Sequence, residues 1–370
     1  MPKFLTAALL GVVALSTQAA AQPVVNCPLR DAPFSVDIPF IDLMLSEKAK
    51  ETLAAEIPGF FEKLPPAAMA TDTPTITAIL NMRLMIIASG NKDIDEKKLD
   101  AALRVLPVTD ADKKARCARY DDERPIFSGL KGKVRVLVFD KSTGFRDAAS
   151  VEAANKMVRE LAEQNNWALV VTDKAGAMRR DVLKQFDTVM WNNVSGDVLT
   201  LNQRKAFEDY IEGGGGFVGI HGSGGDPIYF WDWYPDKLIG ARFVGHPSDP
   251  HFQDAKIRLE RHPDGLGAGL EPGWTMSDEW YSFAASPRLT GAHVIATIDE
   301  KSYSPAGASG NERHLVMGDD HPIAWSREVG KGRSFYSAIG HRTETYSDAR
   351  YRKLIVQAVH WTAGRKFPDN

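Results

Sequence analysis

The sequence predicts an α/β domain with a doubly wound, mainly parallel sheet, preceded by a small all-helical domain. Residues 46–120 repeat apolar side chains three and four positions apart, which is the spacing of amphipathic helices. From Lys133 onward, short apolar runs alternate with helical patterns, which is typical of a sheet with helices on both faces. The polar stretch 121–125 separates the two patterns. We therefore predict a helical domain over residues 22–124 and an α/β domain over residues 125–370.

The first 21 residues have the order of a secretory signal peptide. Lys3 precedes an apolar run from Phe4 to Leu15, and small residues follow up to Ala21. A membrane span needs roughly 20 apolar residues, so this shorter run favours a cleaved signal over a permanent anchor. We expect a mature chain that begins at Gln22, lies in the periplasm or is secreted, and has no membrane span.

The net charge and the cysteine count indicate which classes of partner to expect and whether a disulfide forms. The formal charge is −3, and it becomes −4 when Lys3 is removed with the signal peptide. Nucleic-acid binding favours a basic face, so we expect no nucleic-acid partner. Cys27 and Cys117 are the only cysteines, and an even count in an oxidising compartment favours a disulfide between them, with two buried thiols as the alternative. The oligomeric state is unknown from the sequence.

Three helices are predicted in the N-terminal domain. Ser46 caps the first, Pro74 begins the second, and Gly90 ends it. Asp93 and Glu96 form a capping box for the third. This region contains no histidine, and we expect it to pack on or cap the α/β domain.

The elements of the α/β domain follow in order. Strands are predicted at the apolar runs 134–139, 168–172, 188–191 and 217–220, and helices at 149–165, 181–185 and 201–212. Four such steps in succession favour a doubly wound sheet, whose ligands bind at the carboxyl ends of the strands. Further strands are predicted at 255–259, 293–298, 323–328 and 333–339, and a closing helix at 349–362.

Histidine placement is the main functional signal. All nine histidines lie after residue 220, and several follow predicted strand ends. His221 comes directly after the strand 217–220 and before Gly222, which is the layout of a nucleophile elbow. Ser223 is disfavoured as a nucleophile, because its motif is His-Gly-Ser-Gly-Gly and not Gly-x-Ser-x-Gly.

Imidazoles and carboxylates at converging strand ends favour a divalent metal site, with zinc the most suitable ion. We predict His221, His246 and Glu279 as ligands, with His251 as a further candidate, and proton-transfer roles for Asp278 and His341. The alternative is that each of these residues has a structural role. The remaining histidines are interpreted as structural or solvent-facing: His262, His293, His314, His321 and His360.

Six motifs in the second domain occur in a fixed order: 141–146 (KSTGFR), 219–221 (GIH), 242–247 (RFVGHP), 278–281 (DEWY), 322–325 (PIAW) and 330–336 with 340–341 (GKGRSFY and GH). Together they resemble the ThuA-like (trehalose utilisation) family over about residues 133–364. The resemblance implies a flavodoxin-like fold of the class I glutamine amidotransferase-like superfamily and a role in carbohydrate metabolism. That superfamily's glutaminases need an elbow cysteine, but here His221 stands at the elbow, so glutaminase chemistry is excluded.

The first motif departs from the family at its end. The family usually has a histidine after Gly-Phe-Arg, whereas this chain has Asp147. A carboxylate there can still bind a metal or a sugar hydroxyl, and we predict a catalytic role for Asp147. Within the motifs we predict substrate-binding roles for Lys141, Arg146, Trp280 and Tyr281.

Aromatic side chains gather at 229–234 (YFWDWY) and at Trp280 with Tyr281. Sugar rings stack on aromatic faces, so these clusters favour a small carbohydrate ligand; the alternative is that the rings fill the gap between the domains. The sequence thus predicts an exported protein that acts on a sugar or keto-sugar as a metal-dependent hydrolase, lyase or isomerase. A carbohydrate-binding or sensing module without catalysis, and an adaptor with a vestigial pocket, are the alternatives.

Overall fold

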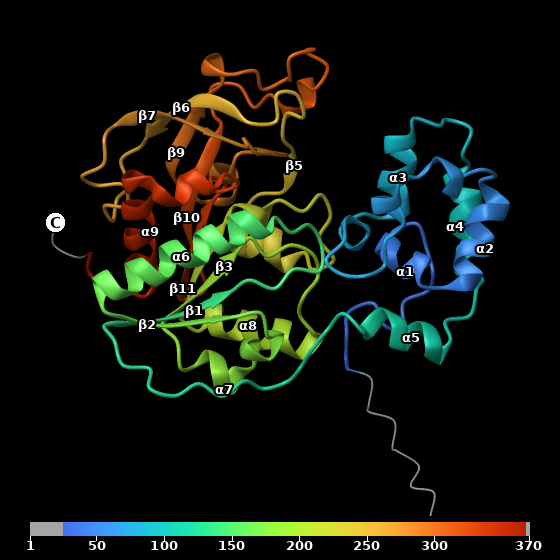
Figure 1. Cartoon of the computed structure of the whole chain (residues 1–370), viewed down its shortest axis with the longest axis horizontal. Helices are drawn as coiled ribbons and strands as arrows, with labels where there is room; N and C mark the ends of the chain where they lie inside the picture. Colours follow the sequence, from blue (N-terminus) through green and yellow to red (C-terminus); the bar gives the residue numbers. More distant parts are fainter. Residues whose placement is uncertain (1–24, 368–370) are drawn as a thin grey trace, which may run out of the picture.

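The computed structural model of the protein describes residues 25–367 and has a helical lobe beside a larger α/β lobe (Figure 1). The predicted signal peptide and its cleavage site lie outside the described residues. No helix of the described part is both long enough and apolar enough to cross a membrane.

Five α-helices form the helical lobe around a small apolar core. The helices are α1 (Phe40–Met44), α2 (Glu47–Glu56), α3 (Met82–Ser89), α4 (Glu96–Arg104) and α5 (Asp110–Cys117). Their core includes Phe34, Phe40, Leu43, Leu53 and Leu103, all fully or almost fully buried. These helices are short, and burial of one face of each against its neighbours stabilises them more than helix propensity does.

Two helix starts differ from the prediction. The second helix begins at Met82 and not at Pro74, because the Asn81 side chain caps it by accepting the Leu84 backbone N–H. The third is capped by Asp95 and not by Asp93. The predicted stop at Gly90 is confirmed, since Gly90 adopts the left-handed conformation that ends many helices.

Nine strands form one sheet, in the order β2-β1-β3-β4-β11-β10-β9-β6-β7. The first five strands in this order pair in parallel, and the remaining pairs are antiparallel. The predicted α/β fold is confirmed, and an antiparallel half extends it. The strands are β1 (Val134–Phe139), β2 (Trp167–Thr172), β3 (Thr188–Asn192), β4 (Gly216–Ile220), β6 (Gln253–Leu259), β7 (Gly273–Asp278), β9 (His293–Asp299), β10 (Pro322–Val329) and β11 (Gly332–Ser337).

Helices cover both faces of the parallel half. The helices α6 (Ala148–Asn165) and α9 (Ala349–Thr362) contact each other, as do α7 (Arg180–Leu183) and α8 (Leu201–Glu212). Right-handed crossovers that move in opposite directions along the sheet place these two pairs on opposite faces. The strands β5 (Phe243–Gly245) and β8 (Ser282–Phe283) form a separate small sheet.

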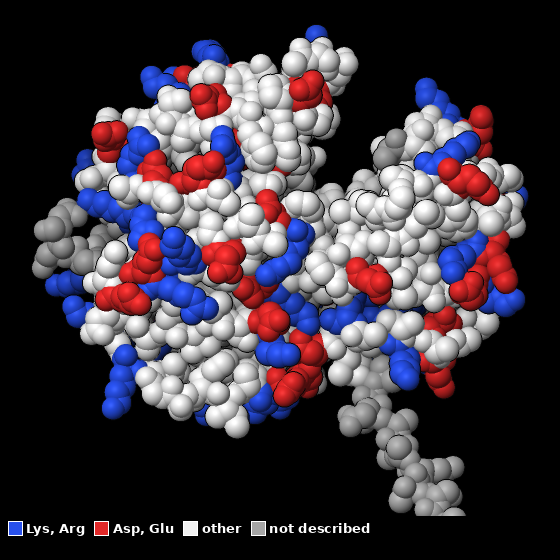
Figure 2. All heavy atoms as spheres, viewed as in Figure 1, with Lys and Arg blue, Asp and Glu red and all other residues white. Residues whose placement is uncertain are grey.

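The helical lobe is joined to the α/β lobe near the carboxyl ends of the parallel strands. The Thr75 N–H donates to Thr143 O at 2.9 Å, and the Tyr120 hydroxyl donates to Asp197 at 2.8 Å. The predicted disulfide between Cys27 and Cys117 is confirmed. A notch separates the outer parts of the two lobes, and side chains of both charges are interspersed on the face shown (Figure 2).

Candidate metal centre

The elbow after β4 presents His221 into the interior. His221 has a φ of +40°, a left-handed conformation that is uncommon for a residue with a side chain. Three residues on, Gly224 packs so closely on Tyr336 that an added Cβ would lie 2.4 Å from its ring. The His221 imidazole is buried, and its Nδ1–H donates to Ala338 O at 2.7 Å. This contact leaves Nε2 as the free ring nitrogen.

Glu279 lies at the centre of four imidazoles. Its Oε2 lies 3.1 Å from His221 Nε2 and 2.8 Å from His341 Nδ1. Its Oε1 lies 3.1 Å from His246 Nε2 and contacts His251 Nε2. Glu279 is itself buried, with an exposed side-chain fraction of 3%. The structure therefore brings together the three predicted ligands, His251 and His341.

In at least two of these histidines, the ring nitrogen that faces Glu279 carries a lone pair and no proton. His221 donates through Nδ1 to Ala338 O, and His246 Nδ1 faces Pro247 O at 3.1 Å. A neutral imidazole that donates at Nδ1 has only an acceptor at Nε2. Two acceptors therefore face each other at each of these contacts with Glu279, and a proton or a metal ion between them resolves the conflict.

Charge around Glu279 is consistent with an ionised carboxylate. Burial alone raises the pKa of Glu279, but the close contacts of its carboxylate with the His221 and His341 imidazoles hold this pKa well below its usual range. Burial alone lowers the pKa of His341, but the Glu279 and Asp147 carboxylates raise this pKa above its ordinary value. A fixed negative charge among imidazoles is a donor set suited to a divalent ion.

Asp278 anchors the loop that carries His341. Its carboxylate accepts the backbone N–H groups of Gly340 and His341, both at 3.0 Å, and the Thr345 hydroxyl at 2.8 Å. It also accepts the N–H of Arg342 at 3.2 Å. Asp278 is fully buried, and these contacts favour a positioning role over the predicted proton transfer.

Asp147 reaches the centre through His341. Its Oδ2 lies 3.2 Å from His341 Nε2, and its side chain is 34% exposed. As the N-cap of α6, it also accepts the backbone N–H groups of Ala149 and Ser150. The predicted site residues Asp147 and His341 are thus in contact, with Asp147 the more exposed of the two.

Trp280 and Tyr281, which were predicted to bind the substrate, are buried beside the centre. Tyr281 stacks on His221 with the ring centroids 4.2 Å apart, and the Trp280 indole N–H donates to Gln253 O at 2.8 Å. His321 supports this segment, because its Nε2 donates to Tyr281 O at 2.8 Å. The more exposed rings are Phe252, stacked on His251, and Phe145, near His341. Sequence reasoning missed these two rings, since isolated phenylalanines carry no local signal.

Lys141 and Arg146 line a cavity whose wall contains none of the residues around Glu279. It has a volume of about 420 Å³ and lies between Thr73 and Pro74 of the helical lobe and the ends of β1 and β2. Its wall includes charged groups of both signs, and Arg146 is adjacent in sequence to Asp147. A cavity of this size is within the range of small-molecule sites.

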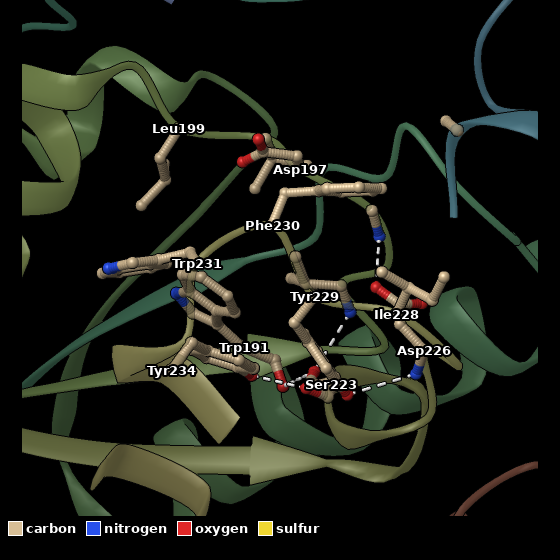
Figure 3. A pocket seen from close by; sticks show the side chains of 14 residues that line it. Trp191, Asp197, Leu199, Ser223, Asp226, Ile228, Tyr229, Phe230, Trp231 and Tyr234 are labelled. Carbon is tan, nitrogen blue, oxygen red and sulfur yellow. Dashed lines mark hydrogen bonds between the residues drawn. The ribbon is translucent and has the colours of Figure 1, made fainter. Parts of the chain in front are cut away.

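The aromatic segment 229–234 packs on the core. Tyr234 stacks on Trp191, with centroids 4.8 Å apart (Figure 3). Trp231 stacks on Trp233. The cavity among these rings has a volume of about 30 Å³, which is room for one or two water molecules and not for a sugar. In its wall, the Ser223 hydroxyl donates to Trp191 O and accepts the Val194 N–H, contacts of a structural side chain.

The other histidines lie apart from Glu279. His262, His321 and His360 are buried, with hydrogen bonds to Ser326, to Tyr281 O and Glu300, and to Trp167 respectively. Burial lowers the pKa of His262 to about 4. His293 and His314 are exposed.

Comparison with known proteins places this geometry in a family. The model of the ThuA family, described as trehalose utilisation, matches residues 135–362. The chain belongs to the ThuA family. That match contains every histidine of the centre, Glu279 and Asp147, and it leaves the helical lobe outside.

Solved structures of ThuA-like proteins are similar to this ThuA-family chain, and the first of the two described next shares its α/β fold. A ThuA-like protein from Bacteroides uniformis is 23% identical, with a TM-score of 0.53, over 65% of this chain and 95% of that one. A ThuA-like protein from Parabacteroides merdae is 15% identical, with a TM-score of 0.45, over 64% of this chain and 92% of that one. No protein with a curated description matches the chain.

Proposed function

We propose that this chain is an exported enzyme of carbohydrate metabolism that acts on a sugar or keto-sugar through a metal-assisted acid/base site. The observation that carries the proposal is the Glu279 carboxylate, buried and contacted by four imidazoles. Membership of a family described as trehalose utilisation supports the substrate class.

The donor set fits a divalent ion. Imidazole nitrogens with one carboxylate are typical zinc ligands, and catalytic zinc sites keep at least one position open for water or substrate. A bound ion would polarise a carbonyl or hydroxyl oxygen of the sugar. The residues that would hold an ion fall into two groups that share Glu279, one with His221 and His341 and the other with His246 and His251.

The chain's own residues supply the acid/base and binding functions. Asp147 is the partly exposed carboxylate beside the cluster, so we assign it the proton transfer, with His341 orienting it. The cavity lined by Lys141 and Arg146 is the proposed place for the sugar, because Arg146 directly precedes Asp147 in the sequence and the wall offers charged partners for hydroxyl groups. The apolar run and small residues of 1–21, together with the disulfide, support export.

Metal content and turnover test the proposal together. The purified chain should contain a divalent metal and convert trehalose or its keto derivative, followed by NMR of the sugar. His221→Ala removes one imidazole but keeps a residue with a Cβ at the turn. The substitution should lower the metal content strongly. His262→Ala is the matched control, since it removes a buried imidazole remote from Glu279. Equal metal content in His221→Ala and wild type would contradict the site, whereas metal without turnover would favour a binding or sensing module.

A further inference from the structure

Glu279 presents its two oxygens to two separate pairs of imidazoles. We infer that the centre binds two divalent metal ions, bridged by the Glu279 carboxylate. This inference rests on the proposed function, because it takes the same cluster to be a metal centre. Oε2 faces His221 and His341, and Oε1 faces His246 and His251.

The spacing within each group fits one ion. The donor atoms of His221, His341 and Glu279 all lie within 4.8 Å of one another, and so do those of His246, His251 and Glu279. Metal–ligand bonds of about 2.0 to 2.2 Å hold two donors of one ion about 3 to 4 Å apart. From Glu279 Oε2, the separation of 3.1 Å to His221 Nε2 lies within this spacing, and that of 2.8 Å to His341 Nδ1 is slightly shorter.

The five donors do not form a single group within the same limit. One ion therefore cannot be bound by both imidazole pairs without rearrangement, while two ions bound to the two oxygens can. Two-metal sites in enzymes hold their ions about 3.5 to 4 Å apart. Two histidines and one carboxylate at each position leave room for water or substrate. The ligands expected from sequence, His221 and His246, are divided between the two positions.

The outer nitrogens of the histidines are held as in metal sites. Metal-binding histidines generally donate the other ring N–H to a carbonyl or a carboxylate. His221 Nδ1 donates to Ala338 O, and His341 Nε2 lies 3.2 Å from Asp147, both in the first group. In the second group, His246 Nδ1 faces Pro247 O. Each group thus contains at least one imidazole oriented for an ion at Glu279.

The two positions differ in their access to solvent. His221, His341 and Glu279 are all buried. The side chains of His246 and His251 are 32% and 41% exposed. A chelator should therefore remove the ion of the outer position first, and the inner ion should leave more slowly.

Reconstitution with one metal tests the inference directly. Full-length protein is stripped with a chelator, loaded with excess Mn²⁺ and freed of unbound ions by gel filtration. Bound manganese is then measured by mass spectrometry and its EPR spectrum is recorded. We expect two ions per chain and an exchange-coupled spectrum in the wild type. His341→Ala and His251→Ala should each retain one ion with an uncoupled spectrum, and the control His262→Ala should retain two.

The outcomes separate this inference from the proposed function. One ion per wild-type chain, lost in both His341→Ala and His251→Ala, would overturn the two-ion centre and leave a metal site standing. The absence of any bound ion would overturn both the two-ion centre and the metal site. It would mean that a proton, and not a metal ion, lies between Glu279 and each imidazole nitrogen that faces it. Circular dichroism identifies a variant that fails to fold. In that case the number of manganese ions bound per wild-type chain still tests the two-ion centre.

Discussion

Asp147 connects a helix terminus to the histidine cluster. Its Oδ1 accepts the N–H groups of Ala149 at 2.9 Å and Ser150 at 3.2 Å, and its Oδ2 faces His341. Partial burial alone raises the pKa of Asp147, but these backbone donors lower it below the usual value. The carboxylate is therefore ionised at neutral pH, as a proton acceptor requires.

Changing Asp147 to Asn separates its two roles. The amide oxygen still accepts the α6 N–H groups, but the negative charge and the acceptor for His341 are lost. We expect sugar turnover to fall about 100-fold or more, since acid/base groups typically contribute that much, with little change in thermal stability. Turnover is measured by NMR at saturating substrate.

Asp348 provides the matched control for this change. It caps α9 in the same way, by accepting the N–H groups of Arg350 and Tyr351. Asp348→Asn therefore alters an equivalent cap away from the cluster and should leave turnover nearly unchanged. Similar turnover in Asp147→Asn and Asp348→Asn would show that Asp147 serves only as a cap.

At the scale of elements, the sequence predicts the parallel half of the sheet well and the antiparallel half in part. The runs that form β1 to β4 are mainly apolar, and β3 and β4 are buried along their whole length, as expected of strands covered on both faces. The strand β7 was not predicted, because its residues alternate irregularly between buried and exposed. The strand β5 was also missed, since three residues carry no period.

The residue types of the centre were predictable, but their arrangement was not. Strand ends converge in a doubly wound sheet, so the candidates His221, His246, His341 and Glu279 could be named. Which oxygen of Glu279 each imidazole faces depends on loops far apart in the sequence. The positioning role of Asp278 could not be predicted for the same reason. A carboxylate in that motif suggests proton transfer, whereas its contacts with Gly340 and Thr345 join residues far apart in the sequence.

Asp226 anchors the loop after β3 to the loop that carries Asp147. It accepts the Ser195 hydroxyl at 2.5 Å and the Gly196 N–H at 2.7 Å. Ser195 O in turn accepts the N–H of Thr143. Burial raises the pKa of Asp226 to about 7, although the two donors oppose it.

This raised pKa predicts a pH dependence of stability. Between about pH 4 and pH 7 the folded protein keeps the Asp226 proton while the unfolded chain releases it, so rising pH favours unfolding. Asp226→Asn removes this effect. The free energy of unfolding of the wild type relative to Asp226→Asn should fall across this window, by up to roughly 4 kcal/mol. Urea titrations at several pH values measure it, and a difference independent of pH would argue that Asp226 is ionised throughout.

At the scale of the whole molecule, the two lobes meet beside the proposed sugar cavity. Thr73 and Pro74 of the helical lobe line that cavity together with Lys141 and Arg146. The helical lobe thus contributes to the proposed binding site, although it lies outside the matched ThuA range.

The disulfide should stabilise the helical lobe without affecting the metal centre. Cys27 and Cys117 are 90 positions apart in the sequence, and closing a long loop restricts the unfolded chain, by roughly 2 to 4 kcal/mol of unfolding free energy in typical cases. The Cys27→Ser, Cys117→Ser double variant should therefore unfold at lower denaturant concentration. Its metal content should equal that of the wild type, because every ligand lies in the α/β lobe. Identical unfolding midpoints would show that packing around Cys27 holds the lobe without the bond, and loss of metal would show that the helical lobe shapes the centre itself.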